Sequence, residues 1–123
     1  MAGKQRLICR SDQLRERGKG WRFTVELLDG EPAAAFAVRY RGRVYAYLNR
    51  CAHVGVELDW TEGEFFDFSG LYLVCATHGA AYHPDSGRCA GGPCRGGRLT
   101  PLPLVERDGC VFLAEEEETD DTT

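Results

Sequence analysis

The sequence predicts an all-β fold of antiparallel sheets, and three observations support this prediction. Short runs rich in β-branched and aromatic residues recur along the 123 residues of the chain. Fifteen glycines and five prolines separate these runs, and both residue types mark turns and loops. No run of about ten or more residues has the amphipathic spacing of a helix.

Seven segments have the character of strands, and turn sequences join two pairs of them. The glycine in Tyr40-Arg-Gly-Arg43 lies between two β-rich runs, and Asp108-Gly109 lies between two others, so each predicts a hairpin. Residues 11–17 are expected to form at most one short turn of helix, capped by Ser11 or Asp12. The predicted strands are Gln5–Arg10, Trp21–Leu27, Ala34–Tyr40, Arg43–Leu48, Leu71–Cys75, Leu102–Glu106 and Cys110–Ala114.

Three segments are predicted as loops, at residues 49–57, 76–81 and 84–98. The last contains five glycines and two prolines, and a loop of this length in a small domain is commonly functional. The chain length predicts a single domain over residues 1–114. Residues 115–123 hold six of the 19 acidic residues and no basic one, so we expect a disordered acidic tail there.

The composition narrows the class of protein. An apolar fraction of 43% and a charged fraction of 28% are ordinary for a soluble globular domain. No apolar run is long enough to span a membrane, and the N-terminus lacks the apolar run of a secretory signal. We therefore expect a cytoplasmic protein without a membrane partner. The basic residues are scattered without interleaved aromatic residues, so no nucleic-acid partner is expected.

Two short segments each supply one cysteine and one histidine, namely Cys51-Ala-His53 and Cys75-Ala-Thr-His78. In an extended chain the i, i+2 spacing of the first pair points both side chains the same way. A turn after Cys75 would bring the second histidine back toward that cysteine. Two cysteines and two histidines in this mixed order are the donor set of a 2Fe–2S cluster in which two imidazoles replace two thiolates on one iron.

A structural zinc site is the alternative, because two cysteines and two histidines also bind zinc. Zinc sites favour one block of cysteines and one block of histidines, whereas each segment here mixes the two residue types. The mixed order favours the cluster. The chain has six cysteines, and without an export signal we expect them to stay reduced, so metal ligation is favoured over a disulfide framework.

On these motifs the chain resembles the Rieske ferredoxin family, from about Leu7 to Leu113. The resemblance implies stacked antiparallel sheets with a small cluster-binding subdomain formed by loops, over about residues 49–98. Beyond the two ligand segments, the residues that carry it are Gly79-Ala-Ala-Tyr82, Gly87-x-Cys89-x-Gly91-Gly92-Pro93 and a closing strand near Pro101–Val105.

The resemblance also implies how one 2Fe–2S cluster would be held. Cys51 and Cys75 would bind the inner iron, and His53 and His78 would bind the outer iron near solvent. The Gly91-Gly92-Pro93 segment would cover the cluster as a third loop. No catalytic residue is expected.

Two departures from the respiratory members of the family bear on the redox potential. A cysteine used there in a disulfide between loops is Val56 here, and a serine that donates to a bridging sulfide is Ala80, while the nearby Tyr82 is retained. Fewer donors to the cluster sulfurs stabilise the reduced state less. We therefore expect a potential of roughly −150 to 0 mV, toward the low end of the Rieske range. The longer spacing between the ligand pairs predicts an extended hairpin within Trp60–Gly70.

The function implied is that of a soluble one-electron carrier, not an enzyme by itself. Its partners would be a flavin-containing reductase and an oxygenase or similar redox acceptor, and the chain would be a monomer or weak oligomer. An oxygenase's catalytic subunit would need a second iron site with two histidines, and only His83 remains, to which we assign no role. Two alternatives stay open, a small Rieske-type subunit of a reductase complex such as nitrite reductase, and a redox or iron sensor.

The remaining cysteines and aromatic residues are predicted to serve packing. Cys89 and Cys94 are interpreted as plain small residues, with a disulfide as the less favoured alternative. Cys9 and Cys110 alternate with apolar neighbours and are expected in the core. The aromatic residues expected to fill the core beneath the hairpin, with one or two left exposed, are Trp60, Phe65, Phe66 and Phe68.

Overall fold

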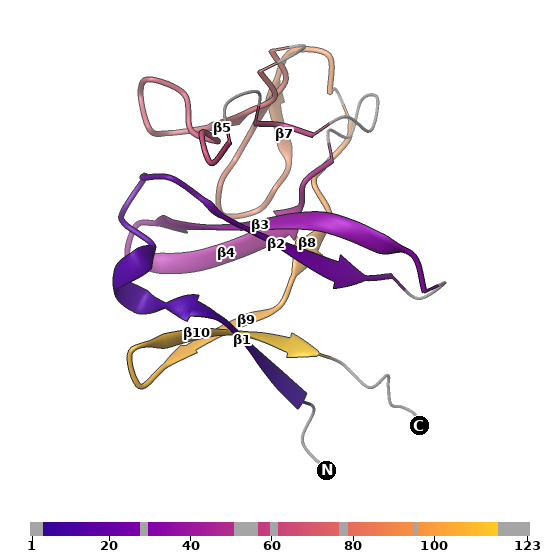
Figure 1. The fold of residues 1–123 in the computed structure, drawn as a ribbon. Coiled ribbons are helices and arrows are strands. Elements are labelled where there is room, and N and C mark those ends of the chain that lie inside the picture. The colour runs from indigo at the N-terminus through magenta and orange to yellow at the C-terminus, as the bar shows by residue number, and fades with distance from the viewer. Residues whose placement is uncertain are drawn as a thin grey trace.

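The structure, a computed structural model, describes residues 4–27, 30–50, 57–59, 62–76, 79–94 and 96–115. Within these residues the strands form three antiparallel sheets, which lie as successive layers in Figure 1. The predicted all-β class with stacked antiparallel sheets is therefore confirmed. No helix in the described part of the chain has the length and apolar character needed to cross a bilayer.

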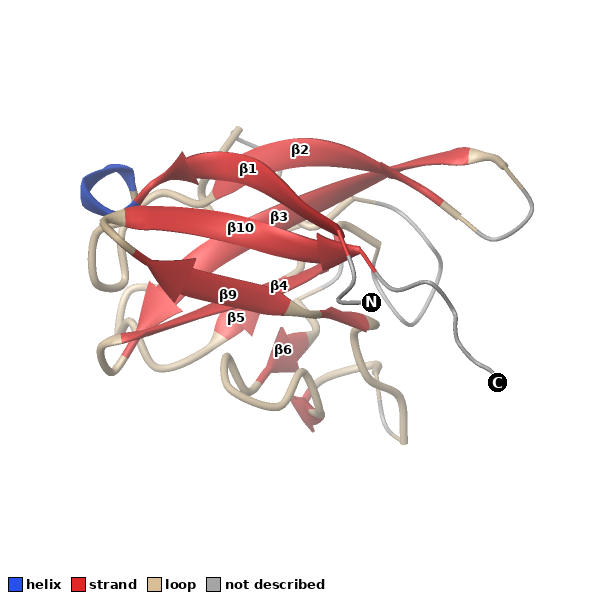
Figure 2. Ribbon diagram, turned by 90° about the horizontal axis from the view of Figure 1, so that it is seen from below, coloured by secondary structure: helices blue, strands red, loops and turns tan. Residues whose placement is uncertain are grey.

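The first sheet brings together the two ends of the described chain, and Figure 2 shows it face on. It contains β1 (Lys4–Arg10), β9 (Leu104–Arg107) and β10 (Cys110–Glu115), in the order β1-β10-β9. Asp108 and Gly109 have φ angles of 54° and 74°. Left-handed backbone at both positions is what a two-residue hairpin loop requires, so the predicted hairpin is confirmed.

The second sheet is the central layer. It contains β2 (Trp21–Glu26), β3 (Pro32–Tyr40), β4 (Arg43–Leu48) and β8 (Pro101–Leu102), in that order. Arg41 and Gly42 connect β3 to β4 with φ angles of 52° and 80°, which confirms the other predicted hairpin.

The third sheet is small and lies in the loop-rich lobe of the molecule. It contains β5 (Leu73–Val74), β6 (Ala81–Tyr82) and β7 (Cys89–Gly91), in the order β5-β6-β7. The sequence predicted only β5, and the segments of β6 and β7 were assigned to loops or left without a strand. Strands of two or three residues with glycine nearby have no alternating pattern long enough to detect.

Two local predictions were wrong. The single strand predicted over Leu102–Glu106 is two strands, because Pro103 interrupts it. Proline has no backbone N–H for a ladder, and at this point the chain leaves β4 in the central sheet and joins β10 in the first sheet. The short helical turn, Ser11–Gln13, is preceded by Arg10 and not by the predicted cap, and the Gln13 side chain accepts a hydrogen bond from the Arg10 backbone N–H.

The middle strand β3 is buried on both faces and separates two cores. Phe36 and Val38 point into the core beneath the lobe, while alternating alanines face the first sheet. Because successive side chains of a strand point to opposite faces, one sequence serves both cores. Small alanine side chains let the first two sheets pack closely. Those alanines are Ala33, Ala35 and Ala37.

An ion pair between Arg39 and Glu106 links the first sheet to the second. Arg39 on β3 donates from both Nη atoms to the Glu106 carboxylate on β9, at 2.6 Å and 3.1 Å. Its Nε also donates to the Leu14 carbonyl at 2.7 Å. The hydrogen bond from Arg39 holds the pKa of Glu106 below its ordinary value of 4.5.

Acidification should remove the stability that this pair provides. A lowered carboxyl pKa stabilises the fold above the unfolded-state value, and that contribution is lost as pH falls through the lower folded-state pKa. Glu106→Gln should melt below the parent protein at neutral pH, with the difference shrinking below pH 4.5. Thermal midpoints measured against pH check this. Glu26→Gln, an exposed residue of β2, is the control for the charge change, and a pH-independent deficit for Glu106→Gln would contradict the prediction.

The predicted division of the chain into a domain and a tail is untested. Residues 116–123 of the predicted acidic tail follow β10 and lie outside the described residues. One domain at residues 1–114 with a tail after it therefore stays a prediction.

Candidate metal centre

Of the four predicted ligands, Cys75 lies within the described residues. It directly follows β5, and its side chain is completely buried. Cys51, His53 and His78 lie outside the described residues. The geometry of the site is therefore built from Cys75 and from the residues at the bases of the two ligand loops.

A buried polar network closes the base of the first ligand loop. The Asn49 side chain donates to the Asp59 carboxylate at 2.9 Å, and its amide oxygen accepts the Leu58 backbone N–H at 2.8 Å. The second oxygen of Asp59 accepts the Gly63 N–H at 2.9 Å. Asn49 and Asp59 are both buried, and they join the chain before Cys51 to the chain after residue 56.

Arg22 on β2 connects this network to the central sheet. Its Nη2 donates to Glu57 at 2.9 Å, and its Nε lies 3.5 Å from the Asp59 carboxylate. The Asp59 side chain has no exposed surface, so the nearby guanidinium offsets part of the cost of burying its charge. Asn49 and Asp59 were not predicted as part of the site. Both are polar residues that flank the first ligand loop in a β-rich sequence, and this position could have indicated a structural role.

The second ligand loop is closed at its base and attached to the first. The Cys75 N–H donates to the Ala80 carbonyl, and the Gly79 N–H donates to the Cys75 carbonyl, both at 2.8 Å. The Ala76 N–H donates to the Leu58 carbonyl at 3.0 Å. This last bond joins the two loops directly, so their ligand-bearing ends start from one shared base.

Gly79 has a φ of +74°, a left-handed conformation that glycine adopts without strain. The hydrogen bond from the Gly79 N–H to the Cys75 carbonyl shows that the chain turns after Cys75, as predicted. The replaced serine position, Ala80, is fully buried, as is Tyr82.

The surroundings of Cys75 fit a residue that binds a metal cluster. Its thiol packs in an apolar core with Leu58, Leu73 and other buried side chains, which keeps water away from any bound group. Metal ligation needs a deprotonated cysteine, and the other three predicted donors lie outside the described residues. Among the described residues, no group of three or more histidine, cysteine or acidic side chains forms another metal site.

The Gly91-Gly92-Pro93 segment packs directly on the second ligand loop. β7 pairs with β6, which places Gly91 opposite Ala81. A Cβ built on Gly92 would lie 2.8 Å from the Gly79 carbonyl oxygen, and its φ is +84°. The close approach of two backbones therefore requires glycine at this position.

Gly92→Ala should loosen this contact, because alanine must adopt left-handed backbone at a cost of about 1–2 kcal/mol and also displace the Gly79 carbonyl. We expect a lower thermal midpoint and faster loss of bound iron to a chelator. Gly91→Ala is the matched control, since a Cβ there meets nothing within 4 Å and the residue has no positive φ. Equal behaviour of the two variants would contradict the assigned contact.

The prediction for Cys89 and Cys94 was wrong. These residues form a disulfide, with Cα atoms 5.6 Å apart, a separation that disulfides commonly span. The prediction assumed that thiols without an export signal stay reduced, and it could not foresee that β7 would bring the pair together. Cys9 is buried as predicted, and Cys110 is half-buried.

A hairpin is present in residues 65–74, so the hairpin predicted within Trp60–Gly70 exists but extends past Gly70 to the end of β5. The Val74 N–H donates to the Phe65 carbonyl at 2.8 Å, and the Asp67 N–H to the Tyr72 carbonyl at 3.0 Å. Phe65 is fully buried and stacks on Phe36 with ring centroids 3.9 Å apart. Phe68 is fully exposed. Phe66 is half-buried and packs against the same core. Of the three described rings, one therefore fills the core, one packs at its edge and one is exposed, and Trp60 lies outside the described residues.

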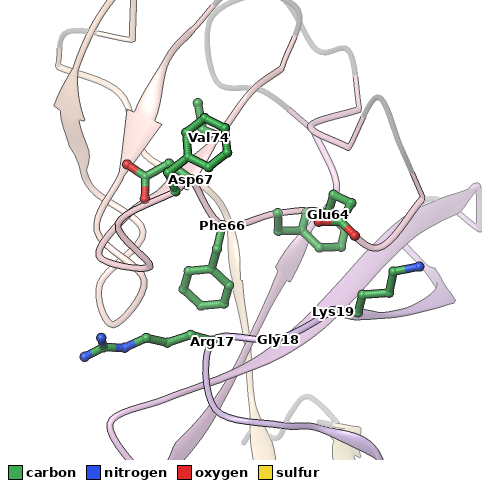
Figure 3. A pocket seen from close by; sticks show the side chains of 9 residues that line it. Arg17, Gly18, Lys19, Glu64, Phe66, Asp67 and Val74 are labelled. Atoms are coloured by element: carbon green, nitrogen blue, oxygen red, sulfur yellow. The ribbon is translucent and has the colours of Figure 1, made fainter.

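An open hollow lies between this hairpin and the segment that enters β2. Its volume is about 670 Å³. Figure 3 shows Arg17 and Lys19 on one wall, with Phe66 and Asp67 on the other. Cys75 is not among its described lining residues, whereas the neighbouring Val74 is.

Comparison with known proteins decides the family. The family model of the Rieske [2Fe-2S] domain matches residues 4–105, which is most of the chain. The chain belongs to the Rieske [2Fe-2S] domain family. A 2Fe–2S cluster is the cofactor of this Rieske domain, as the two cysteine–histidine segments predicted. No curated protein sequence matches the chain.

Solved ferredoxin structures share the Rieske fold of this chain. The ferredoxin of carbazole 1,9a-dioxygenase from Nocardioides aromaticivorans IC177 aligns with a TM-score of 0.70 and 23% identity, over 92% of this chain and 99% of that chain. The Sphingomonas yanoikuyae B1 ferredoxin aligns with a TM-score of 0.67 and 19% identity, over 91% and 99%. A chain in a complex of reduced oxygenase and oxidized ferredoxin in carbazole 1,9a-dioxygenase aligns with a TM-score of 0.69 and 21% identity, over 94% and 97%.

Proposed function

We propose that this Rieske protein is a soluble one-electron carrier that passes electrons from a flavin-containing reductase to an oxygenase. The observation that carries the proposal is the match to the Rieske domain over residues 4–105, which is most of the chain. The bound cluster supplies the chemistry, since it accepts and releases one electron. The protein is then an electron-transfer component and not a catalyst.

Cys51, His53, Cys75 and His78 are the proposed ligands. The burial of Cys75 supports its place on the inner iron, where a thiolate is sheltered from water. The hydrogen bond from Ala76 to Leu58 supports convergence of the two segments, because it ties the second loop to the base of the first. On this proposal the two histidines face the partner, and the buried network at Asn49 and Asp59 keeps the first loop in position.

An oxygenase is the favoured acceptor because similar structures include ferredoxin–oxygenase complexes of carbazole 1,9a-dioxygenase. The similar structures also include ferredoxins that this chain covers almost completely, which supports a ferredoxin-type carrier. The zinc-bound module stays an outcome of the test, as does a redox or iron sensor.

A redox titration of the purified protein tests the proposal. We expect brown protein with iron and sulfide in equal amounts, an electron paramagnetic resonance signal after dithionite, and a midpoint of roughly −150 to 0 mV. We expect a low midpoint potential because Ala80, which is buried, has no hydroxyl that could donate to a cluster sulfur. A colourless zinc protein would overturn the function, and a clearly positive midpoint would overturn the argument from Ala80.

A further inference from the structure

The Cys89–Cys94 disulfide closes the loop that packs on the second ligand loop. It encloses residues 90–93 and joins the start of β7 to the chain beyond Pro93. At the tip of this ring, Gly92 contacts the Gly79 backbone so closely that a Cβ would lie 2.8 Å from the Gly79 oxygen. The closed ring therefore rests on the residue that follows the predicted ligand His78.

The two sulfurs of the disulfide differ in access to solvent. Cys94 is 3% exposed and packs in the core beneath the lobe. Cys89 is half-buried and lines an open hollow of about 370 Å³. Because thiol–disulfide exchange needs direct access to the attacked sulfur, an external thiol reaches Cys89 and not Cys94.

The hollow beside Cys89 carries positive charge. Arg88 and Arg98 line it together with Gly96 and Gly97. Arg98 donates to the Ser86 carbonyl at 3.2 Å, and neither arginine forms an ion pair with another described residue. A cleft lined by charge of one sign raises the local concentration of small molecules of the opposite sign.

We propose that Cys89 is a thiol-exchange site for a small thiol that carries a carboxylate, and that opening the disulfide there loosens the cover of the second ligand loop. The thiolate sulfur attacks Cys89 Sγ and forms a new disulfide with it. The bond to Cys94 breaks, and Cys94 Sγ takes the electron pair and then a proton. A second molecule of the same thiol attacks the mixed disulfide, which leaves Cys89 reduced and releases the disulfide of the small thiol.

The released Cys94 thiol has acceptors in place. Its sulfur lies 3.2 Å from the Gly91 carbonyl oxygen and 3.4 Å from that of Ala81. A protonated thiol can donate to these carbonyls, so the reduced residue keeps its buried position and the bond can form again. The ring itself is no longer closed, and its hold on Gly79 weakens. This consequence for the cluster rests on the proposed function, whereas the exchange at Cys89 does not.

Two thiols of similar size and opposite charge test the site on the cluster-loaded protein. Mercaptopropionate and cysteamine are compared at equal thiolate concentration and low ionic strength, and adducts are located by peptide mass mapping. We expect a mixed disulfide on Cys89, formed about tenfold faster with mercaptopropionate. Arg88→Gln combined with Arg98→Gln should bring the two rates together, whereas Arg107→Gln, on the first sheet, should leave the ratio unchanged.

Several results would overturn the exchange site. The first is rapid alkylation of Cys89 and Cys94 in the purified protein before any thiol is added, which would show that no disulfide is present. The second is a mixed disulfide that forms on Cys94 before Cys89. The third is a ratio of the two rates that stays the same when both arginines are replaced. Each of these results is measured by mass spectrometry and does not require a bound cluster. A purified protein without iron would therefore contradict the proposed function but leave the test of the exchange site intact.

Hydrogen exchange tests the effect on the ligand loop. In the protein reduced at Cys89 and Cys94, and in the Cys89→Ser/Cys94→Ser variant, amides at residues 79–82 should exchange about tenfold faster than in the oxidised parent. Iron loss to a chelator should accelerate in parallel. Amides of β1 serve as the internal reference and should not change. Unchanged exchange at residues 79–82 in both the reduced parent and the variant would refute the loosening.

Discussion

Cys75→Ser should produce a protein that folds but binds no cluster stably. A serine hydroxyl stays protonated at neutral pH and binds iron far more weakly than a thiolate, so we expect the affinity for the cluster to fall by more than the roughly 10- to 100-fold typical of changes around the ligands. Serine fills nearly the same volume in the buried position behind β5, which favours a folded product. Iron and sulfide content, with the visible absorption of the purified variant, measures the effect.

Cys9→Ala is the matched control for this loss. Cys9 is also a buried thiol, at 4% exposure, but it packs between the first two sheets. Burial raises the pKa of the Cys9 thiol to about 11, which marks an inert packing residue. The control variant should keep its full iron content, with stability lowered by about 1–2 kcal/mol. A Cys75→Ser protein that retains a normal cluster would show that Cys75 is not a ligand.

Asp59→Ala should lower the stability of the protein by about 2–5 kcal/mol. The substitution leaves the Asn49 side-chain amide and the Gly63 N–H without their acceptor, and buried unpaired donors each cost about 1–3 kcal/mol. It also removes the carboxylate beside Arg22. We expect a thermal midpoint lower by about 10 °C or more, measured at a fixed scan rate because cluster loss is irreversible.

The same substitution should accelerate iron loss to a chelator, because Asn49 and Asp59 close the first ligand loop. Glu57→Ala is the control, since Glu57 pairs with the same arginine but its side chain is 51% exposed. Exposed ion pairs contribute about 0–1 kcal/mol, so this variant should behave almost as the parent. Equal effects of the two substitutions would mean that the buried network does not hold the loop.

The long strands and both hairpins could be predicted because the determining residues are neighbours in sequence. Arg41-Gly42 and Asp108-Gly109 adopt left-handed backbone between runs of β-forming residues, and local chemistry is enough for such turns. The break between β8 and β9 also has a local cause, because Pro103 has no N–H to donate to a strand ladder. The sequence does not indicate, however, that the chain passes from one sheet to another at this residue. That outcome depends on the separate partners of β8 and β9.

The short strands of the lobe and the disulfide could not be predicted in the same way. β6 and β7 exist because packing holds Ala81 and Gly91 opposite each other, not because their residues prefer extended structure. Cys89 and Cys94 meet because the ring between them folds back on Gly79. The sequence-based prediction that these two thiols stay reduced was wrong because the fold brings them within bonding distance.

The sequence by itself determined the class of centre, because the mixed order of cysteine and histidine in two short segments depends only on residue type and spacing. The tertiary structure alone decided how those segments are held. Asn49, Asp59 and the bond from Ala76 to Leu58 join parts of the chain that are distant in sequence. Hydrogen bonds of this kind depend on how β5 and the central sheet pack together, so no local sequence pattern indicates them.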